Sequence, residues 1–232
     1  LTITGSGSSF IITNGVNFNI GSPGRGVFNV LNGASADTSA IVSINNRSEA
    51  HVTGTGSIWS AQGGITNLGL LTVTNGGTLA SNGRVTVGTL GTATIADGGT
   101  LTATQVDISG TATIGSGGTV QSSGSVSVGS ASSGVLTVAD GGALRLTDPT
   151  QGVRIGNGIG TGGTLIIGAA EGQAAVAPGT VEAPYVVFEG SANPGTRTLV
   201  FNHTSNNYLF APYITGGSGK GNVNVLAGTT TL

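Results

Sequence analysis

Residues 93–101 read Ala-Thr-Ile-Ala-Asp-Gly-Gly-Thr-Leu, which is two short apolar segments separated by a glycine pair. The pattern also begins at Leu71, Ala112 and Leu136, so successive copies lie 22, 19 and 24 residues apart. Within each copy, Val, Ile or Leu alternates with Thr or another small residue, which is typical of a strand with one buried face. The four glycine pairs are Gly76 and Gly77, Gly98 and Gly99, Gly117 and Gly118, and Gly141 and Gly142.

A second apolar motif lies between these copies and repeats with a similar period, beginning at Val85, Val106, Val126 and Val153. A period near 20 residues, with short strands and no helical pattern, predicts an all-β fold of the parallel β-helix type, in which each period forms one rung of a solenoid. About ten rungs stacked roughly 4.8 Å apart would give a rod on the order of 50 Å long. We expect the Asn/Asp-Gly-Gly corners to supply the positive φ of a sharp turn.

Antiparallel hairpins are the alternative, because Asn-Gly and Asp-Gly are also hairpin signals. A β-sandwich usually has large aromatic core residues, yet this chain has no aromatic residue between Trp59 and Tyr185. Stacked aliphatic side chains inside a narrow rod fit the sequence better. Phe10 and Trp59 occupy matching positions in a weaker echo of the repeat, where each is as readily a core or corner residue as an exposed contact.

The composition excludes several classes of protein. The chain has 232 residues, 44 of them glycine, with only seven Lys or Arg against nine Asp or Glu and a net charge of −2. Seven scattered cations cannot supply the counterion release that nucleic-acid binding needs, so no nucleic-acid partner is expected. Without cysteine, neither a disulfide framework nor a thiolate metal site can form. No apolar run approaches the ~20 residues of a membrane-spanning helix.

The aromatic residues are unevenly distributed, since six of the ten lie between residues 185 and 213. Large rings bury more area than aliphatic side chains, and a solenoid needs a terminal unit that closes its core. We therefore divide the chain into β-helix rungs over 1–184, irregular before about residue 50, and an aromatic-rich C-terminal segment over 185–232. The candidate folding or capping residues of that segment are Phe201, Tyr208, Phe210 and Tyr213. A locally wider core is the alternative interpretation.

The Thr-Val-x-Asn/Asp-Gly-Gly-Thr-Leu rungs resemble the passenger domains of bacterial autotransporters (type V secretion), which are right-handed β-helices. Residues 199–214 and 219–232 resemble segments near the end of such passengers. The resemblance covers most of 50–232 and implies a cell-surface or outer-membrane location. It also implies that a signal peptide and a membrane-anchoring C-terminal barrel lie outside this chain, and that 185–232 assists folding at the cell surface.

No signature of catalysis, of a cofactor or of a metal site is found in the sequence. Neither His51 nor His203 has an adjacent carboxylate motif, so structural or surface roles are favoured over general-base roles. Asp97 and Asp140 lie on equivalent corners, with Ser116 between them, and turn formation explains them more simply than paired acid catalysis does. The glycine runs at 156–160 and 216–221 match neither a dinucleotide fingerprint nor a phosphate loop.

The resemblance implies an adhesin passenger fragment, and the residues themselves predict a stiff, weakly charged rod that is not an enzyme and has no cofactor. The expected partner is a host cell surface, an extracellular matrix protein, or the same protein on another cell. The expected contact surface is an extended polar face of Thr, Ser and Asn, although no binding residue can be singled out. The second hypothesis is a non-binding structural stalk and folding module of a larger autotransporter. The third is a glycan-processing β-helix enzyme, which would require several carboxylates meeting on adjacent rungs.

Overall fold

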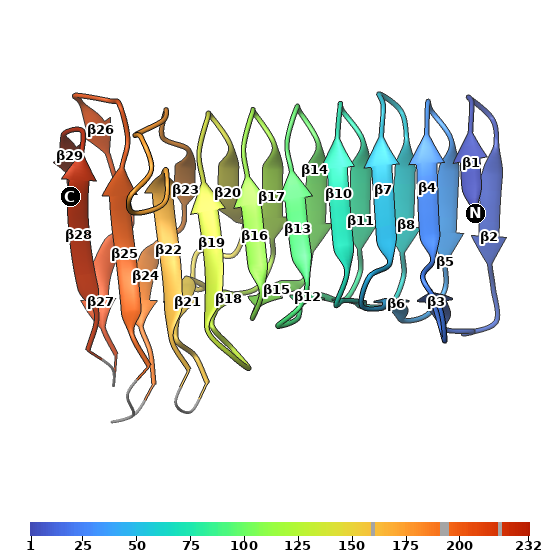
Figure 1. Cartoon of the computed structure of the whole chain (residues 1–232), viewed down its shortest axis with the longest axis horizontal. Helices are drawn as coiled ribbons and strands as arrows, with labels where there is room; N and C mark the ends of the chain where they lie inside the picture. Colours follow the sequence, from blue (N-terminus) through green and yellow to red (C-terminus); the bar gives the residue numbers. More distant parts are fainter. Residues whose placement is uncertain (159–160, 191–194, 218–219) are drawn as a thin grey trace.

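The computed structural model describes residues 1–158, 161–190, 195–217 and 220–232, and these form a β-solenoid of about ten turns. Each turn contributes one strand to each of up to three parallel sheets, so equivalent strands lie side by side along the rod (Figure 1). None of the described residues forms a helix long and apolar enough to cross a membrane.

The first sheet is formed, in spatial order, by β1 (Thr2–Thr4), β4 (Val27–Leu31), β7 (Glu49–Thr53), β10 (Leu70–Thr74), β13 (Thr92–Ile95), β16 (Thr111–Ile114), β19 (Gly134–Val138), β22 (Gly163–Gly168), β25 (Arg197–Asn202) and β28 (Asn222–Ala227). The second sheet is formed by β2 (Ser9–Ile12), β5 (Ser35–Thr38), β8 (Ile58–Ala61), β11 (Thr78–Ser81), β14 (Thr100–Ala103), β17 (Thr119–Ser122), β20 (Ala143–Leu146) and β23 (Thr180–Glu182).

The third sheet is formed by β3 (Phe18–Ile20), β6 (Val42–Ile44), β9 (Ile65–Asn67), β12 (Arg84–Val87), β15 (Gln105–Ile108), β18 (Val126–Val128), β21 (Val153–Ile155), β24 (Tyr185–Phe188) and β27 (Tyr213–Gly216). A separate pair, β26 (Tyr208–Leu209) and β29 (Thr230–Thr231), lies near the C-terminus.

The register confirms the repeat that the sequence predicts. Leu71 pairs with Ala93, Ala93 with Ala112, and Ala112 with Leu136, so the first residues of all four copies stack in one column. The second motif stacks in the same way, with Val85, Val106, Val126 and Val153 in a single column of the third sheet. Every pairing between these named strands is parallel, which rules out the hairpin alternative.

The two glycines of each corner have different physical roles. Asn75 and Gly76 adopt φ values of 53° and 75°, and the corners of the other three copies repeat this pair of left-handed residues. The second glycine, Gly77, has no positive φ; instead, a Cβ there would lie 2.5 Å from the carbonyl oxygen of Val52. Glycine is therefore required first for backbone conformation and then for close approach to the preceding turn.

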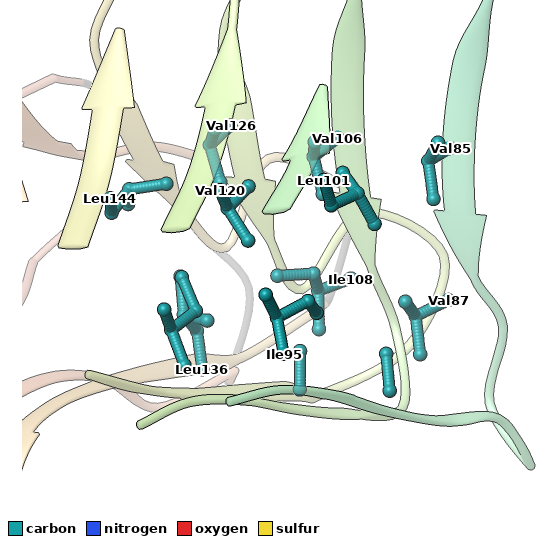
Figure 2. A pocket seen from close by; sticks show the side chains of 13 residues that line it. Val85, Val87, Ile95, Leu101, Val106, Ile108, Val120, Val126, Leu136 and Leu144 are labelled. Atoms are coloured by element: carbon teal, nitrogen blue, oxygen red, sulfur yellow. The ribbon is translucent and has the colours of Figure 1, made fainter. Parts of the chain in front are cut away.

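Aliphatic side chains fill the interior of the rod. Figure 2 shows side chains from several turns, among them Ile95, Leu101, Ile108 and Leu136, directed into the space between the sheets. The void that remains there is about 20 Å³, and all of its lining residues are Val, Ala, Ile or Leu. An apolar void of that size offers a water molecule no hydrogen-bond partner, so the interior is dry packing space.

A cluster of four aromatic rings lies near the N-terminal end of the rod. Phe28 contacts both Phe18 and Trp59 at centroid separations of 4.9 Å, and Phe10 lies 5.7 Å from Phe18. Phe10 and Trp59 stack in one column with Ala36 between them, which confirms that they hold equivalent positions. The small side chain of Ala36 leaves room for the rings on either side. From the sequence, a core position for Phe10 and Trp59 stays open, and a concentration of aromatic residues is expected only over 185–213.

The four candidate folding or capping residues lie in two environments. Phe201, Tyr208 and Phe210 are buried, and the rings of Phe201 and Phe210 meet edge to face at 5.1 Å. Tyr213 is 62% exposed and lies against Tyr185 at 5.7 Å, so it belongs to the surface rather than to this packed group. The division of the chain at 184/185 and the role of the segment in folding stay predictions.

Candidate interaction surface

Polar side chains form continuous columns on the outside of the first sheet. Thr72, Thr94, Thr113 and Thr137 are consecutive members of one such column, and each is half-buried by its neighbours. Alternation along each strand directs these hydroxyls outward while the intervening aliphatic residues face the core. The result is a polar ribbon along the middle turns, as expected for the extended face of Thr, Ser and Asn.

His51 continues this column beyond Thr72, and here one expectation from the sequence was wrong. Nε2 of His51 lies 3.1 Å from Oε2 of Glu49, so the histidine does have a neighbouring carboxylate. Residues two apart on a strand point to the same face, which brings the two side chains together. Nδ1 of His51 lies 2.7 Å from Oγ1 of Thr72. Both ring nitrogens are thus engaged in side-chain contacts along the surface of the first sheet.

A groove runs along the corner between the third and first sheets at the N-terminal turns. This corner groove has a volume of about 560 Å³, within the range of small-ligand sites. It is lined by Gly21, Ser22, Pro23, Gly24, Arg25, Asn45, Asn46, Arg47 and Leu68. A second hollow extends the corner groove toward Leu90 and Thr92. Asn46, Arg47 and Leu68 line both hollows.

The register explains why the groove combines charge with apolar surface. Val27 pairs with Glu49, Glu49 with Leu70, and Leu70 with Thr92. The residues two positions earlier in the four turns are Arg25, Arg47, Leu68 and Leu90. Two arginines therefore lie on neighbouring turns and two exposed leucines on the next two.

The groove carries an excess of positive charge. Arg25 forms an ion pair with Glu49, and the pKa of that carboxyl is lowered chiefly by its hydrogen bond with His51 and then by Arg25. Arg47 makes no ion pair with any described residue. Because Glu49 neutralises Arg25, the groove has a net charge of one positive unit, which is that of Arg47. The side chains of Arg47 and its neighbour Asn46 are both exposed.

A third hollow lies on the second sheet and has no charged residue. Its lining consists of Ser81, Asn82, Thr102, Ala103, Thr104, Gln121, Ser123 and Thr147. These hydroxyls and amides can form hydrogen bonds but cannot neutralise a charged partner. The corner groove is therefore the better candidate for an oriented contact.

The two aspartates considered in the sequence lie at turn positions of the described chain. Asp97, Ser116 and Asp140 occupy successive turn positions, as expected, with φ values of 51°, 46° and 50°. Their place at left-handed positions supports the turn-forming explanation. No group of three or more His, Asp or Glu able to hold a metal lies within the described part of the chain. Residues 159–160 and 218–219 of the two glycine runs lie outside it.

Comparisons with known proteins assign no family. No family model and no curated protein matches the sequence. Among solved structures, the chain is similar to a TibA fragment described as hyper-glycosylated by TibC catalysis. The match has 16% identity and a TM-score of 0.24, and covers 99% of this chain and 98% of that one. At this TM-score the backbones do not superpose as one shape, so the fold assignment depends on the strand pairing of this chain itself.

The residues of the corner groove were missed in the sequence, although a signal for them was present. Arg25, Arg47, Leu68 and Leu90 are spaced by 22, 21 and 22 residues, which is the period of the rungs. The glycine-pair motif is absent before residue 71, so nothing in the sequence aligned the first two of these positions with the regular turns.

Proposed function

We propose that this chain is a surface-exposed adhesin of the autotransporter-passenger kind, which binds its partner and catalyses no reaction. The observation that supports binding most directly is the corner groove, where Arg47 provides an uncompensated positive charge beside exposed amide and leucine side chains. Guanidinium and amide groups bind carboxylates and hydroxyls, which are abundant on cell-surface glycans and matrix proteins.

Self-association between cells is the second form of the proposal. Asp97 and Asp140 lie at the turns between the first and second sheets, whereas Arg47, which has no ion pair among the described residues, lies at the corner between the third and first sheets. Opposite charges at different corners allow two copies to attract each other side by side. Contacts between exposed charges weaken as salt is added, so such settling of cells should be sensitive to ionic strength.

The experiment compares non-adherent bacteria that display residues 1–232 on a surface anchor with bacteria that display the anchor alone. Cells retained on host-cell monolayers and on purified matrix proteins are counted, and settling of the cultures is recorded at low and high salt. Retention or settling above the anchor control is expected. If neither occurs while circular dichroism shows β structure, the adhesin proposal fails and the chain acts as a stalk and folding module.

A pair of matched variants localises the activity. Arg25→Gln with Arg47→Gln removes both cations of the groove, and Arg84→Gln with Arg145→Gln removes two exposed cations on other faces. We expect the first pair to lower retention and the second to leave it unchanged. Equal effects of both pairs would show that net charge, rather than the groove, determines attachment.

A further inference from the structure

Arg197 interrupts a column in which the other aligned turns have glycine or, once, a small serine side chain. Gly134 pairs with Gly163, and Gly163 pairs with Arg197. By the same register, this position is Gly26, Ser48, Gly69, Gly91 and Gly110 in earlier turns and Gly221 in the last. A large cation is thus found where the solenoid otherwise places glycine or serine.

The glycines of this column are required by close backbone contacts. A Cβ at Gly134 would lie 2.1 Å from the carbonyl oxygen of Ile108, and one at Gly163 would lie 2.2 Å from that of Val128. Arg197 departs from this requirement, because it places a Cβ and a long side chain at the same position. The other turns form the same strand pairing without an arginine at this position, so the solenoid does not require one. Such local departures concentrate at functional sites.

The guanidinium is buried and only partly satisfied. Arg197 is 4% exposed, and its Nη1 donates to the carbonyl oxygen of Gly195 at 3.1 Å. Among the described residues, Nε and Nη2 are buried without a hydrogen-bond partner, and no ion pair includes Arg197. A buried cation without a counter-charge is strongly unfavourable, so these two donors favour an anionic partner.

The two free nitrogens belong to one edge of the guanidinium, the edge that binds a carboxylate through two parallel N–H donors. Two glycines with positive φ lie against it. A Cβ at Gly156 would lie 2.4 Å from Nε, and a Cβ at Gly190 would lie 2.2 Å from Nη2. A side chain at either glycine would therefore have to displace the guanidinium.

The local charge indicates a singly charged ligand. Glu189, next to Gly190, accepts a hydrogen bond from Nη1 of Arg154 at 2.7 Å, so that carboxylate already has its own cation. The remaining charge at this corner is the single positive charge of Arg197. We propose that Arg197 forms a carboxylate-binding site, in which its Nε and Nη2 donate to the two oxygens of one carboxylate group of an acidic ligand. This site is separate from the corner groove and does not depend on the adhesin proposal.

The test measures thermal unfolding of the 232-residue chain at constant pH and ionic strength with acetate, glucuronate, N-acetylglutamate, sulfate or chloride. We expect Tm to rise in a saturable manner with the carboxylates relative to chloride, because a ligand bound only to the folded state stabilises it. A stronger response to glucuronate would identify an acidic sugar as the source of the carboxylate, and a stronger response to N-acetylglutamate an acidic peptide. A rise with sulfate but not acetate would overturn the carboxylate assignment.

Two variants separate the site from general salt effects. Arg197→Gly restores the residue of the column and should abolish the carboxylate response, whereas Arg145→Gln removes an arginine that is about half exposed and should retain it. A response that persists in Arg197→Gly, or no response in the parent chain, would overturn the proposal. Should Arg197→Gly fail to fold, the Nε–H resonance of Arg197 in the parent chain decides: a shift that saturates with acetate supports the site, and an unchanged resonance refutes it.

Discussion

Gly77 lies so close to Val52 that a Cβ at residue 77 would be 2.5 Å from the Val52 carbonyl oxygen, although the φ of Gly77 is not positive. Its neighbour Gly76 has the opposite property, since its φ is 75° and the nearest atom to an added Cβ is Oγ1 of the Thr55 side chain at 3.1 Å. One corner thus contains two glycines that are required for different reasons, and substitution can distinguish them.

We expect Gly76→Ala to lower the free energy of unfolding by about 1–2 kcal/mol because of the left-handed backbone. Gly76→Asn should recover much of that loss, since asparagine tolerates this conformation. Gly77→Ala should cost about 3 kcal/mol through overpacking, and Gly77→Asn should recover nothing. Urea denaturation of the four variants measures these differences. Equal recovery by asparagine at both positions would contradict the assignment of distinct roles.

Ala36 provides a test of the N-terminal aromatic cluster. It is 3% exposed and lies in the column between Phe10 and Trp59, so a larger side chain must displace a ring. Ala36→Leu should therefore destabilise the protein by about 1–3 kcal/mol. Ala80→Leu is the matched control, because Ala80 pairs with Ser60 and Thr102 and is only half-buried. Both variants are compared by urea denaturation; a similar loss in the two would show that Ala36 is not limited by the rings.

The regular part of the fold could be predicted from the sequence because the same small set of physical requirements recurs in each turn. A left-handed residue, a glycine for close approach and alternating aliphatic residues repeat from Leu71 to Leu144, and they define both the period and the register. The aromatic cluster could not be predicted in the same way. Phe18 and Phe28 come together only through turns whose corners lack the glycine-pair motif.

The candidate sites were harder to predict because they depend on residues in the loops. Arg25 and Arg47 become neighbours only once the turns are aligned. The residues next to each arginine form no motif that would single it out in the sequence. Arg197 could be recognised only as the one large side chain in a column of glycine and serine, and that column is defined by register and not by periodicity alone. Two-residue spacing along a strand also brings Glu49 to His51, a contact that a search for adjacent residues overlooks.

His203 should make stability depend on pH near neutrality. It is buried, its Nε2 lies 2.8 Å from Oγ1 of Thr230, and its Nδ1 has no partner among the described residues. Burial lowers the pKa of His203 below its usual 6.5, with a smaller opposing effect from the backbone at Ser205. Below pH 6.5 the unfolded chain binds a proton that the folded chain resists, so stability falls as pH decreases toward the lowered pKa.

The measurement is the free energy of unfolding between pH 7 and pH 5, for the parent chain and for His203→Gln. The parent should lose stability over this interval and the variant should show a flatter dependence, because glutamine does not titrate. The variant will also differ by a constant amount from lost packing, so the slope and not the absolute value is compared. Parallel slopes would exclude His203 as the source of the pH dependence.

Tyr208 connects the C-terminal segment to the loop before β23, since its hydroxyl donates to the carbonyl oxygen of Gly179 at 2.8 Å. Tyr208→Phe leaves this carbonyl without its donor and should cost about 1–2 kcal/mol. Tyr213→Phe is the matched control; the Tyr213 ring is 62% exposed, so the change should be within about 0.5 kcal/mol. Equal effects in urea denaturation would show that the Tyr208 hydrogen bond contributes nothing specific.

The same residue predicts a loss of stability in alkali. Burial raises the pKa of Tyr208 to about 12 from an ordinary value of 10.0. Between these pH values the folded chain retains a proton that the unfolded chain releases, so stability is intact below pH 10 and declines as pH rises toward 12. Tyrosinate absorbance should show one tyrosine ionising near the upper value in the parent chain and none there in Tyr208→Phe. If the late ionisation persists in the variant, it belongs to another tyrosine and the Tyr208 hydroxyl is not shielded from solvent in solution.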